Sequence, residues 1–409
     1  MLISGIQMEL YLYPMPRKRR KRNPHYTEHN QVSLIRGGSE FFKLMEELID
    51  KAEACIHVQF YIFDDDDTGR AIMQQLIEAV ERGIKVYMVL DGYASRGISD
   101  EFVKEIVDAG IRFRWFEPFL KARYFYFGRR LHHKLLVVDE RWALVGGLNV
   151  SDRYNDLPHQ PAWLDWAVVT EGEVSAELFR VAIDMWKQAR WSIKKDRDLI
   201  LPFKPSPYPG TCLARVRQND WVRTRNQVTR SYLEMFKKAN SHIYLMSSYF
   251  LPGKIFKRRL SSAIKRGVKV KIVVTGISDV YVSKQAERYM YRWLFRNHVE
   301  IYEYTKNVLH AKMACYDGKW FTVGSYNFNY ISTYASIELN VDVLDDELAQ
   351  EGELRIEEII KNDCTRITEE EYRTKYNFFS RFFQLLCYLF IRVTFYLFTF
   401  YFRAKKHAD

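Results

Sequence analysis

The chain has 409 residues, of which 62 are Lys or Arg and 51 are Asp or Glu, so its net charge at neutral pH is +11. This length predicts two to three domains; a hydrophobic share of 47% excludes a disordered chain, and a charged share of 28% excludes one mostly embedded in a membrane. The basic excess indicates an anionic partner, either nucleic acid or acidic lipid. The five cysteines form no CxxC pair, which argues against a disulfide framework and a cysteine-based zinc site, and favours a reducing compartment.

The chain begins with a weakly apolar segment, which is followed by an unbroken basic run from Arg17 to Arg22. Glu9 and Pro14 interrupt the apolar segment, and the charges follow it rather than precede it, so it does not have the pattern of a secretory signal. We expect residues 1–29 to form a basic arm. Such an arm is either solvated and flexible or drawn to an anionic surface.

The two halves of the chain show the same order of predicted elements: helix, buried strand, helix, strand. We expect Ser39 to cap the first helix, and the acidic run Asp64 to Asp67 to form a solvated loop in which Asp67 caps the second helix. The elements span residues 39–52, 55–63, 71–83 and 84–92 in the first half, and 232–241, 242–250, 255–267 and 268–276 in the second.

Matching elements of the two halves lie at a nearly constant distance along the chain, which indicates an internal repeat of domain size. Apolar strands that alternate with amphipathic helices predict α/β lobes whose sheets are covered. We expect a first lobe at 30–200 and a second at 212–365, joined by a linker at 201–211 whose alternating prolines exclude a helix or a central strand. The predicted fold class is therefore α/β, with two similar lobes packed by pseudo-twofold symmetry around one active site.

Each half also carries one copy of the motif H-x-K-x4-D-x6-G-[GS]-x-N, at residues 132–149 and 310–327. Two copies in register with the repeat argue against a chance match. The matched residues are His132, Lys134, Asp139, Gly146, Gly147 and Asn149 in the first copy, and His310, Lys312, Asp317, Gly324, Ser325 and Asn327 in the second.

These residue types suit phosphodiester chemistry if the two copies meet between the halves. A His and a Lys two positions apart on a strand point to the same face. Lysines and asparagines from both copies can then bind the non-bridging oxygens, while one His attacks phosphorus and the other protonates the leaving oxygen. The glycines allow the backbone to approach the ligand closely, so Gly147 and Ser325 are expected near the phosphate with Asn149 and Asn327.

Two acids are candidates to orient the histidine rings. Asp165 lies downstream of His132, and Glu338 lies downstream of His310 at a similar separation, each at the entry of an otherwise apolar strand. An acidic partner would select the ring tautomer and stabilise imidazolium.

The remaining polar residues of the motifs have competing interpretations. Asp139 and Asp317 serve either catalysis or the turn that follows the strand. Ser325 is a weak candidate for a nucleophile, because the other copy has glycine at the matching position. His133 and Cys315 are expected to be buried and structural. No His, Cys and Asp cluster lies outside the motifs, so we expect neither a metal nor a cofactor.

The duplicated motif resembles that of the phospholipase D superfamily, and residues 249–279 and 309–329 resemble the bacterial cardiolipin synthases. The resemblance implies two phospholipase D-like lobes and a phosphohistidine mechanism without metal or nucleotide. It implies that His132 and His310 are the nucleophile and the general acid, and that the two motif lysines and two motif asparagines hold the phosphate.

By the same resemblance, the expected reaction transfers a phosphatidyl group from one phosphatidylglycerol to another and releases glycerol. A hydrolytic phospholipase D, a transferase that uses another alcohol, a nuclease and an inactive membrane scaffold are the alternatives. The aromatic tail argues against a nuclease, so no nucleic-acid partner is expected, and the two intact motifs argue against a scaffold.

The C-terminal region, residues 366–409, includes a segment from Phe378 to Phe402 in which nearly half of the side chains are aromatic. Its length could span a bilayer, but Arg392 near the middle would cost about 2.5–3.5 kcal/mol, and Phe and Tyr favour the interface. We expect this tail to lie in or dip into the membrane, with a true span or a protein-docking helix as alternatives. The basic segments would add attraction to acidic lipid at the cytoplasmic face of a bacterial cell membrane.

Overall fold

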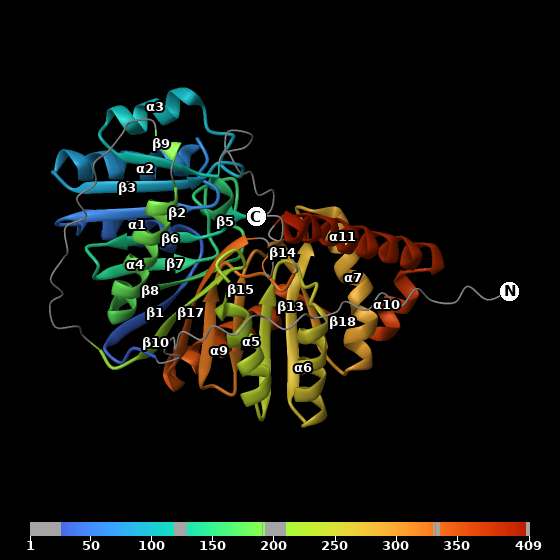
Figure 1. The fold of residues 1–409 in the computed structure, drawn as a ribbon. Helices are drawn as coiled ribbons and strands as arrows, with labels where there is room; N and C mark the ends of the chain where they lie inside the picture. The colour runs from blue at the N-terminus through green and yellow to red at the C-terminus, as the bar shows by residue number, and fades with distance from the viewer. Residues whose placement is uncertain are drawn as a thin grey trace.

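The computed structural model describes residues 26–117, 129–189, 191–192, 210–329, 332 and 336–405, and for 191–192 and 395–405 the backbone only. These residues form two α/β lobes that stand side by side, each built on one mixed sheet (Figure 1). The predicted α/β class with two similar lobes is confirmed. The basic run and most of the proline-rich linker lie outside the described residues.

The first lobe has an eight-stranded sheet in the order β1-β8-β7-β6-β2-β3-β4-β9. The neighbours β2, β3 and β4 run parallel, and the other neighbouring pairs are antiparallel. The strands are β1 (Asn30–Arg36), β2 (Cys55–Phe60), β3 (Lys85–Asp91), β4 (Arg112–Phe116), β6 (Lys134–Val138), β7 (Trp142–Gly146), β8 (Trp166–Gly172) and β9 (Trp191–Ser192), and the helices are α1 (Ser39–Asp50), α2 (Asp67–Glu81), α3 (Asp100–Asp108) and α4 (Glu173–Gln188).

The second lobe repeats this order as β10-β17-β16-β15-β12-β13-β14, with β11 and β18 at its two edges. The strands are β10 (Leu213–Asp220), β11 (Arg225–Asn226), β12 (His242–Ser247), β13 (Lys269–Ile277), β14 (Glu300–Val308), β15 (Lys312–Tyr316), β16 (Trp320–Gly324), β17 (Ser336–Leu344) and β18 (Cys364–Ile367). The helices are α5 (Gln227–Lys238), α6 (Lys254–Lys265), α7 (Tyr281–Arg296), α9 (Asp346–Asp363), α10 (Glu369–Lys375) and α11 (Phe378–Lys405).

The repeated helices and strands lie where apolar periodicity predicts them, but two helix caps differ. Gly38, not Ser39, occupies the N-cap position of α1, with a φ of 96° that favours glycine. Asp66, not Asp67, caps α2: its Oδ1 accepts the N–H of Gly69 at 2.9 Å. Each helix boundary therefore differs by one residue from the one that the side-chain preferences predicted.

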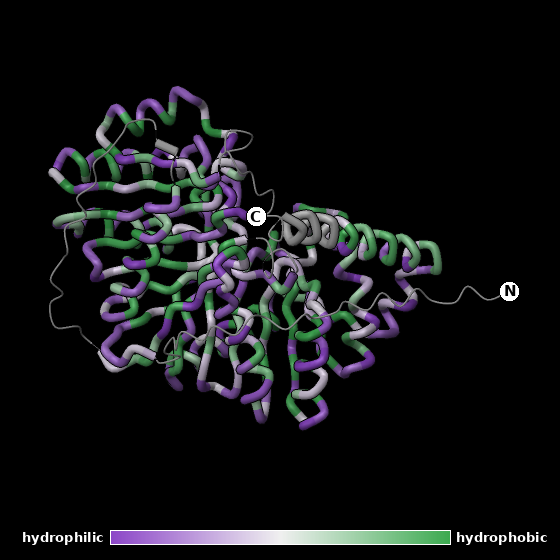
Figure 2. Tube along the Cα trace, in the orientation of Figure 1, coloured by the Kyte–Doolittle hydropathy of each residue, from purple (hydrophilic) through white to green (hydrophobic). Residues whose placement is uncertain are grey.

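One apolar core joins the two lobes. It includes Leu135 and Val168 from the first sheet, Met313 and Val341 from the second, and residues of α4 and α9 that lie between the sheets. Figure 2 shows apolar residues along the strands of both sheets and along α11. Because the core is shared, the two lobes are held in one arrangement, and the strand ends that carry the motif histidines face each other.

The C-terminal helix α11 lies along α7, and its C-terminal end points toward the first lobe (Figure 1). Gln384, Cys387 and Tyr388 are buried on the side that faces α7, and the hydroxyl of Tyr372 donates to Gln384 Oε1 at 2.6 Å. None of the helices in the described part of the chain is long and apolar enough to cross a bilayer. One side of the predicted tail is therefore docked on the second lobe.

Candidate active site

The two motif copies meet at the junction of the lobes, where the backbone of each lobe pairs with the other. The short strand β5 (Arg130–Leu131) of the first lobe pairs in parallel with β17 of the second. The N–H of His132 donates to the carbonyl of Ile337 at 3.0 Å, and the N–H of His310 donates to that of Leu164 at 2.8 Å. Each acceptor directly precedes one of the two predicted orienting acids, so the lobes exchange equivalent contacts.

Each histidine ring is held by the acid of the opposite lobe. His132 Nδ1 lies 2.8 Å from Glu338 Oε2, and His310 Nδ1 lies 2.6 Å from Asp165 Oδ2. Both carboxylates are fully buried. Sequence order associates each acid with the histidine of its own half, but the contacts cross between the lobes. Because a carboxylate occupies Nδ1 of each ring, Nε2 is the nitrogen available for chemistry.

The two motif lysines are almost completely buried beside the histidines. Lys134 Nζ donates to the carbonyl of His132 at 2.9 Å and lies 4.9 Å from the centre of the Tyr61 ring. Lys312 Nζ donates to the carbonyl of His310 and lies 3.6 Å from the Asp165 carboxylate. Burial lowers the pKa of Lys312 to about 8, and burial together with the charge of Lys312 lowers that of Lys134 well below its ordinary value. A bound phosphate would relieve this repulsion.

The two histidine–acid pairs differ electrostatically. Burial lowers the pKa of both imidazoles; the charge of Glu338 opposes this at His132, whereas Lys312 reinforces it at His310. Burial raises the pKa of Asp165 to about 6. Burial also opposes ionisation of Glu338, yet His132 and two serine hydroxyls hold the pKa of that carboxyl below its ordinary value. His132 therefore has the more firmly ionised partner.

Gly147 and Ser325 lie against the two predicted orienting acids, Asp165 and Glu338. The Ser325 hydroxyl donates to Glu338 Oε2 at 2.5 Å. A Cβ on Gly147 would lie 2.2 Å and 2.5 Å from the two carboxylate oxygens of Asp165. The contacts of this pair are therefore to the acids: the glycine leaves room for one carboxylate, and the serine holds the other.

The two motif asparagines are not equivalent. Asn149 Oδ1 accepts the N–H of Ile62 at 3.1 Å, and its Nδ2 donates to the Tyr154 hydroxyl at 2.9 Å. That hydroxyl lies 3.4 Å from His310 Nε2. Asn327 Oδ1, in contrast, is buried without a hydrogen-bond partner among the described residues. Asn149 thus supports Tyr154, while Asn327 keeps unused hydrogen-bonding capacity.

Tyr154 is a site residue that the sequence did not reveal. It follows Asn149 by five residues, where the second copy has Ser332, so the repeat itself gives no signal for it. Its ring is fully buried and packs edge-on against His310, with 5.1 Å between the ring centres. No described residue hydrogen-bonds Nε2 of His132, whose ring packs against Tyr61 at 4.8 Å. The reactive nitrogens of the two histidines therefore have different surroundings.

Asp139 and Asp317 lie at the other end of their strands, away from the histidines. Asp139 accepts the backbone N–H groups of residues 53–55 at 2.7 to 2.9 Å, and Asp317 accepts those of residues 240–242 at 2.8 to 2.9 Å. Both have positive φ values, 53° and 54°. These contacts hold the loop before β2 or β12, which favours the turn interpretation over the catalytic one. His133 and Cys315 are fully buried, as predicted.

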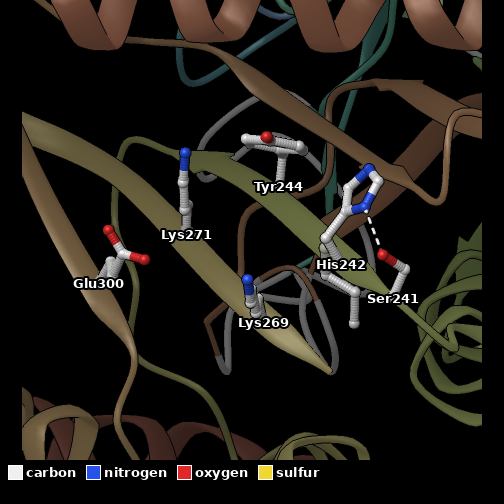
Figure 3. Close-up of a pocket in the computed structure, with 7 residues that line it drawn as sticks. Ser241, His242, Tyr244, Lys269, Lys271 and Glu300 are labelled. Carbon is white, nitrogen blue, oxygen red and sulfur yellow. Dashed lines mark hydrogen bonds between the residues drawn. The ribbon is translucent and has the colours of Figure 1, made fainter. Parts of the chain in front are cut away.

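A surface pocket of about 400 Å³ lies away from this site, at the start of β12, β13 and β14 (Figure 3). Two of its basic side chains already have acidic partners on α9: His242 Nε2 lies 2.9 Å from Glu353, and Lys271 pairs with Glu357. No motif histidine or lysine lines it. Among the described residues, no group of three His, Cys, Asp or Glu side chains could hold a metal ion.

The family model described as "Cardiolipin synthase, PLD-like domain" matches residues 45–178 and 232–360, one stretch in each lobe. The chain belongs to this cardiolipin synthase family. It is 32% identical over 356 residues to cardiolipin synthase B of Salmonella typhi and 29% identical over 357 residues to that of Escherichia coli K12, with 84% of each chain covered in both cases. The resemblance found in the two motifs is thereby confirmed.

The fold is also similar to solved structures. The phosphatidylserine synthase of Haemophilus influenzae Rd KW20 superposes with a TM-score of 0.69 at 13% identity, covering 90% of this chain and 95% of that one. At this identity the likeness concerns the fold alone. It agrees with the duplicated α/β architecture of the cardiolipin synthase family member described here.

Proposed function

We propose that this cardiolipin synthase family member transfers a phosphatidyl group from one phosphatidylglycerol to the free hydroxyl of a second, with His132 as the nucleophile. The observation that carries the proposal is the pair of crossed histidine–acid contacts, His132 with Glu338 and His310 with Asp165. They leave Nε2 of both rings available at one junction. The buried lysines beside the rings supply positive charge for a phosphodiester.

In the first step, Nε2 of His132 attacks the phosphorus of phosphatidylglycerol. The bond between phosphorus and the glycerol oxygen breaks, and His310 gives that oxygen its proton. Lys134, Lys312 and the amide of Asn327 bind the non-bridging oxygens as charge builds on them. The products are free glycerol and a phosphatidyl group bonded to His132.

In the second step, His310 is neutral and takes the proton from a hydroxyl of the second phosphatidylglycerol. The freed oxygen attacks phosphorus, and the bond between phosphorus and His132 Nε2 breaks. Cardiolipin leaves, and His310 again holds the proton it lost, so the cycle is balanced without a cofactor. Water in place of the second lipid would yield phosphatidic acid, which is the hydrolytic alternative.

The assignment of His132 as nucleophile is supported by the surroundings of the two rings. Nε2 of His310 faces the Tyr154 hydroxyl at 3.4 Å, a partner suited to a group that exchanges protons. Nε2 of His132 has no hydrogen-bond partner among the described residues, as a nitrogen that must attack phosphorus requires. Glu338, the acid on His132, has a lowered pKa and would stabilise the positive charge on the ring.

The proposal is tested by stopping turnover of labelled phosphatidylglycerol without the use of acid. Mass spectrometry then identifies the residue of the enzyme that carries the label. We expect an adduct on His132 and cardiolipin as the product. His132→Ala should abolish the adduct, whereas His310→Ala should slow turnover but still permit some adduct. Label on His310 alone would reverse the two roles. Phosphatidic acid in place of cardiolipin would indicate a hydrolase.

We further propose that the protein binds peripherally to the cytoplasmic face of a bacterial cell membrane through its C-terminal tail. The exposed side of α11 supports this, because its large exposed side chains are all apolar. Their exposed fractions run from 42% to 78%, and they are Phe378, Phe379, Phe382, Phe383, Leu386, Leu389, Phe390 and Val393.

Ending the chain after Asn377 should move the protein from the membrane pellet to the supernatant, while thermal melting still reports a folded two-lobed core. Unchanged sedimentation with membranes would contradict the role of the tail. A tail-less chain that fails to melt cooperatively would show that the contact between α11 and α7 is required for folding.

A further inference from the structure

Besides the tail, we propose that the entrance of the active site carries a second membrane-docking surface of its own, suited to a bilayer of anionic phospholipid. This surface, here called the rim, consists of Ile277, Val280, Tyr281 and Val282, which run from the end of β13 to the start of α7, together with a cationic cluster of Lys254, Lys257 and Arg392. It would hold the entrance at the level of the lipid headgroups. The inference rests on the proposed function only for the identity of the substrate.

The apolar side chains of the rim are exposed, whereas the surface of a water-soluble protein usually carries polar side chains at such positions. The exposed fractions are 50% for Ile277, 42% for Val280, 65% for Tyr281 and 37% for Val282. Four large apolar side chains are thus exposed within six consecutive residues, and exposed apolar groups concentrated in this way mark interaction surfaces. The exposed side chains of the rim therefore suit an apolar partner.

The rim is continuous with the apolar side of α11. The ring centres of Tyr281 and Phe383 are 6.4 Å apart. The exposed apolar residues of α11 recur with helical spacing along one side, and the opposite side is buried through Gln384 and Cys387. Because that buried side is held by α7, the helix cannot turn its apolar side inward. The rim and α11 thus face one partner together.

The rim is also continuous with the active site. Thr275, two residues before Ile277, accepts the N–H of Leu309 at 3.4 Å through its hydroxyl, and Leu309 directly precedes His310. Asp279, inside the rim segment, accepts the hydroxyl of Tyr249 at 2.5 Å. Tyr249 lies two residues after Ser247, which pairs in register with Lys312 of the second motif. A bilayer on the rim would therefore meet the entrance to the catalytic histidines.

Positive charge gathers beside these apolar groups. Lys254 and Lys257 are three residues apart on α6, and Lys257 Nζ lies 5.8 Å from the ring centre of Trp293 on α7. Trp293 packs in one cluster with Tyr388 of α11, whose ring centre is 5.6 Å from the Arg392 guanidinium. Burial and the two neighbouring charges accordingly lower the pKa of Lys257. None of the three has an ion-pair partner within the described ranges. Ile255, 38% exposed, lies between the two lysines in sequence. Cations interleaved with exposed apolar groups fit an anionic bilayer, where headgroup phosphates supply the missing negative charge.

The experiment measures binding of the full chain to vesicles of phosphatidylcholine alone and to vesicles that also contain phosphatidylglycerol. One variant combines Ile277→Ser, Val280→Ser and Tyr281→Ser, and a second combines Lys254→Gln and Lys257→Gln. The matched control is Leu354→Ser, which alters a leucine that is 70% exposed on α9, outside the rim. All variants keep the tail, and because the altered groups are exposed or at the surface, thermal melting should not change.

We expect the triple variant to bind both kinds of vesicle about tenfold more weakly, because apolar contact is lost whatever the headgroup. The double lysine variant should lose about fivefold per charge on the anionic vesicles only. Leu354→Ser should bind like the unaltered chain. Unchanged vesicle binding of the triple variant would overturn the proposal. A change from dimer to monomer with vesicle binding intact would also overturn it, because the rim would then be a protein interface.

Activity on a short-chain, water-soluble phosphatidylglycerol separates this inference from the proposed function. The rim variants should turn over that substrate at the rate of the unaltered chain, since no rim residue is placed in the catalytic machinery. If the unaltered chain binds vesicles through the rim but makes no product from any phosphatidylglycerol, the proposed function fails and the docking surface stands. If turnover is normal and the rim variants bind normally, only the docking surface fails.

Discussion

The crossed pairing of acids and histidines predicts a specific effect for the substitution Gly147→Ala. The new Cβ would lie 2.2 Å from Asp165 Oδ1, whereas ordinary contact begins at 3.4 Å, so the carboxylate must move away to make up the difference. The main chain does not prevent the substitution, because Gly147 is not among the described glycines with positive φ. The perturbation therefore falls on the acid and not on the backbone.

The expected consequence appears at His310, the histidine of the opposite lobe, because Asp165 holds its Nδ1 at 2.6 Å. A misplacement of about 1 Å in a catalytic group costs on the order of 10²-fold in rate. We therefore expect cardiolipin formation to slow about 100-fold, which corresponds to about 2.7 kcal/mol in activation free energy. Steady-state assays with phosphatidylglycerol measure this loss, and ¹⁵N-histidine spectra identify the ring that changes.

The matched control is Ser325→Ala, at the equivalent position of the second copy. It removes the 2.5 Å hydrogen bond to Glu338 and introduces no clash. The loss of that bond should cost about 0.5–1.5 kcal/mol, or up to about tenfold in rate, and it should perturb the ring of His132. A normal rate for Gly147→Ala would refute the reasoning from Asp165. A spectral change at His132 in that variant, with His310 unaffected, would refute the crossed pairing.

Four further outcomes follow from the site. Because burial lowers the pKa of Lys312 to about 8, the free enzyme should lose this charge as the pH rises through that value, so kcat/KM should fall; a flat profile well above pH 8 would contradict this. Tyr154→Phe should lower kcat about tenfold or more and shift the pH profile of the step that uses His310, whereas an unaltered profile would assign Tyr154 to packing alone. Asp139→Ala should lower the free energy of unfolding by about 2–3 kcal/mol in urea melts, with normal activity per folded molecule; lost activity at normal stability would restore the catalytic interpretation. EDTA should leave turnover intact, and activity that a divalent ion restores after chelation would overturn the mechanism.

Local features of this chain could be predicted because their causes are local. The helix over Ser39–Asp50 and the strand over Cys55–Phe60 follow from apolar periodicity, which needs only near neighbours in sequence. The pairing of His132 with Lys134 on one face follows from the two-residue period of a strand. The cap at Asp66 could not be told from its neighbour because two adjacent aspartates compete for one position, and the cap at Gly38 depends on a positive φ that side-chain preference does not reveal.

Contacts between distant residues could not be predicted in the same way. His132 and Glu338 are 206 residues apart, and His310 and Asp165 are 145 apart. Nothing in the local sequence indicates Tyr154, because its role depends on its proximity to His310 of the other lobe. Which side of α11 is buried likewise depends on α7, because the segment is apolar all round and its own pattern selects no side.

The order of the residues is enough to show that this chain is a duplicated α/β protein with two histidine–lysine motifs, an aromatic tail and a relationship to the cardiolipin synthases. These properties depend on the periodicity and spacing of residues, which can be recognised without knowledge of the packing. The packing of the lobes was needed to show which acid contacts which histidine, and that Gly147 leaves room for one acid while Ser325 holds the other. The reason is the pseudo-twofold packing of the lobes, which brings the acid at the entry of each lobe's strand against the histidine of the other.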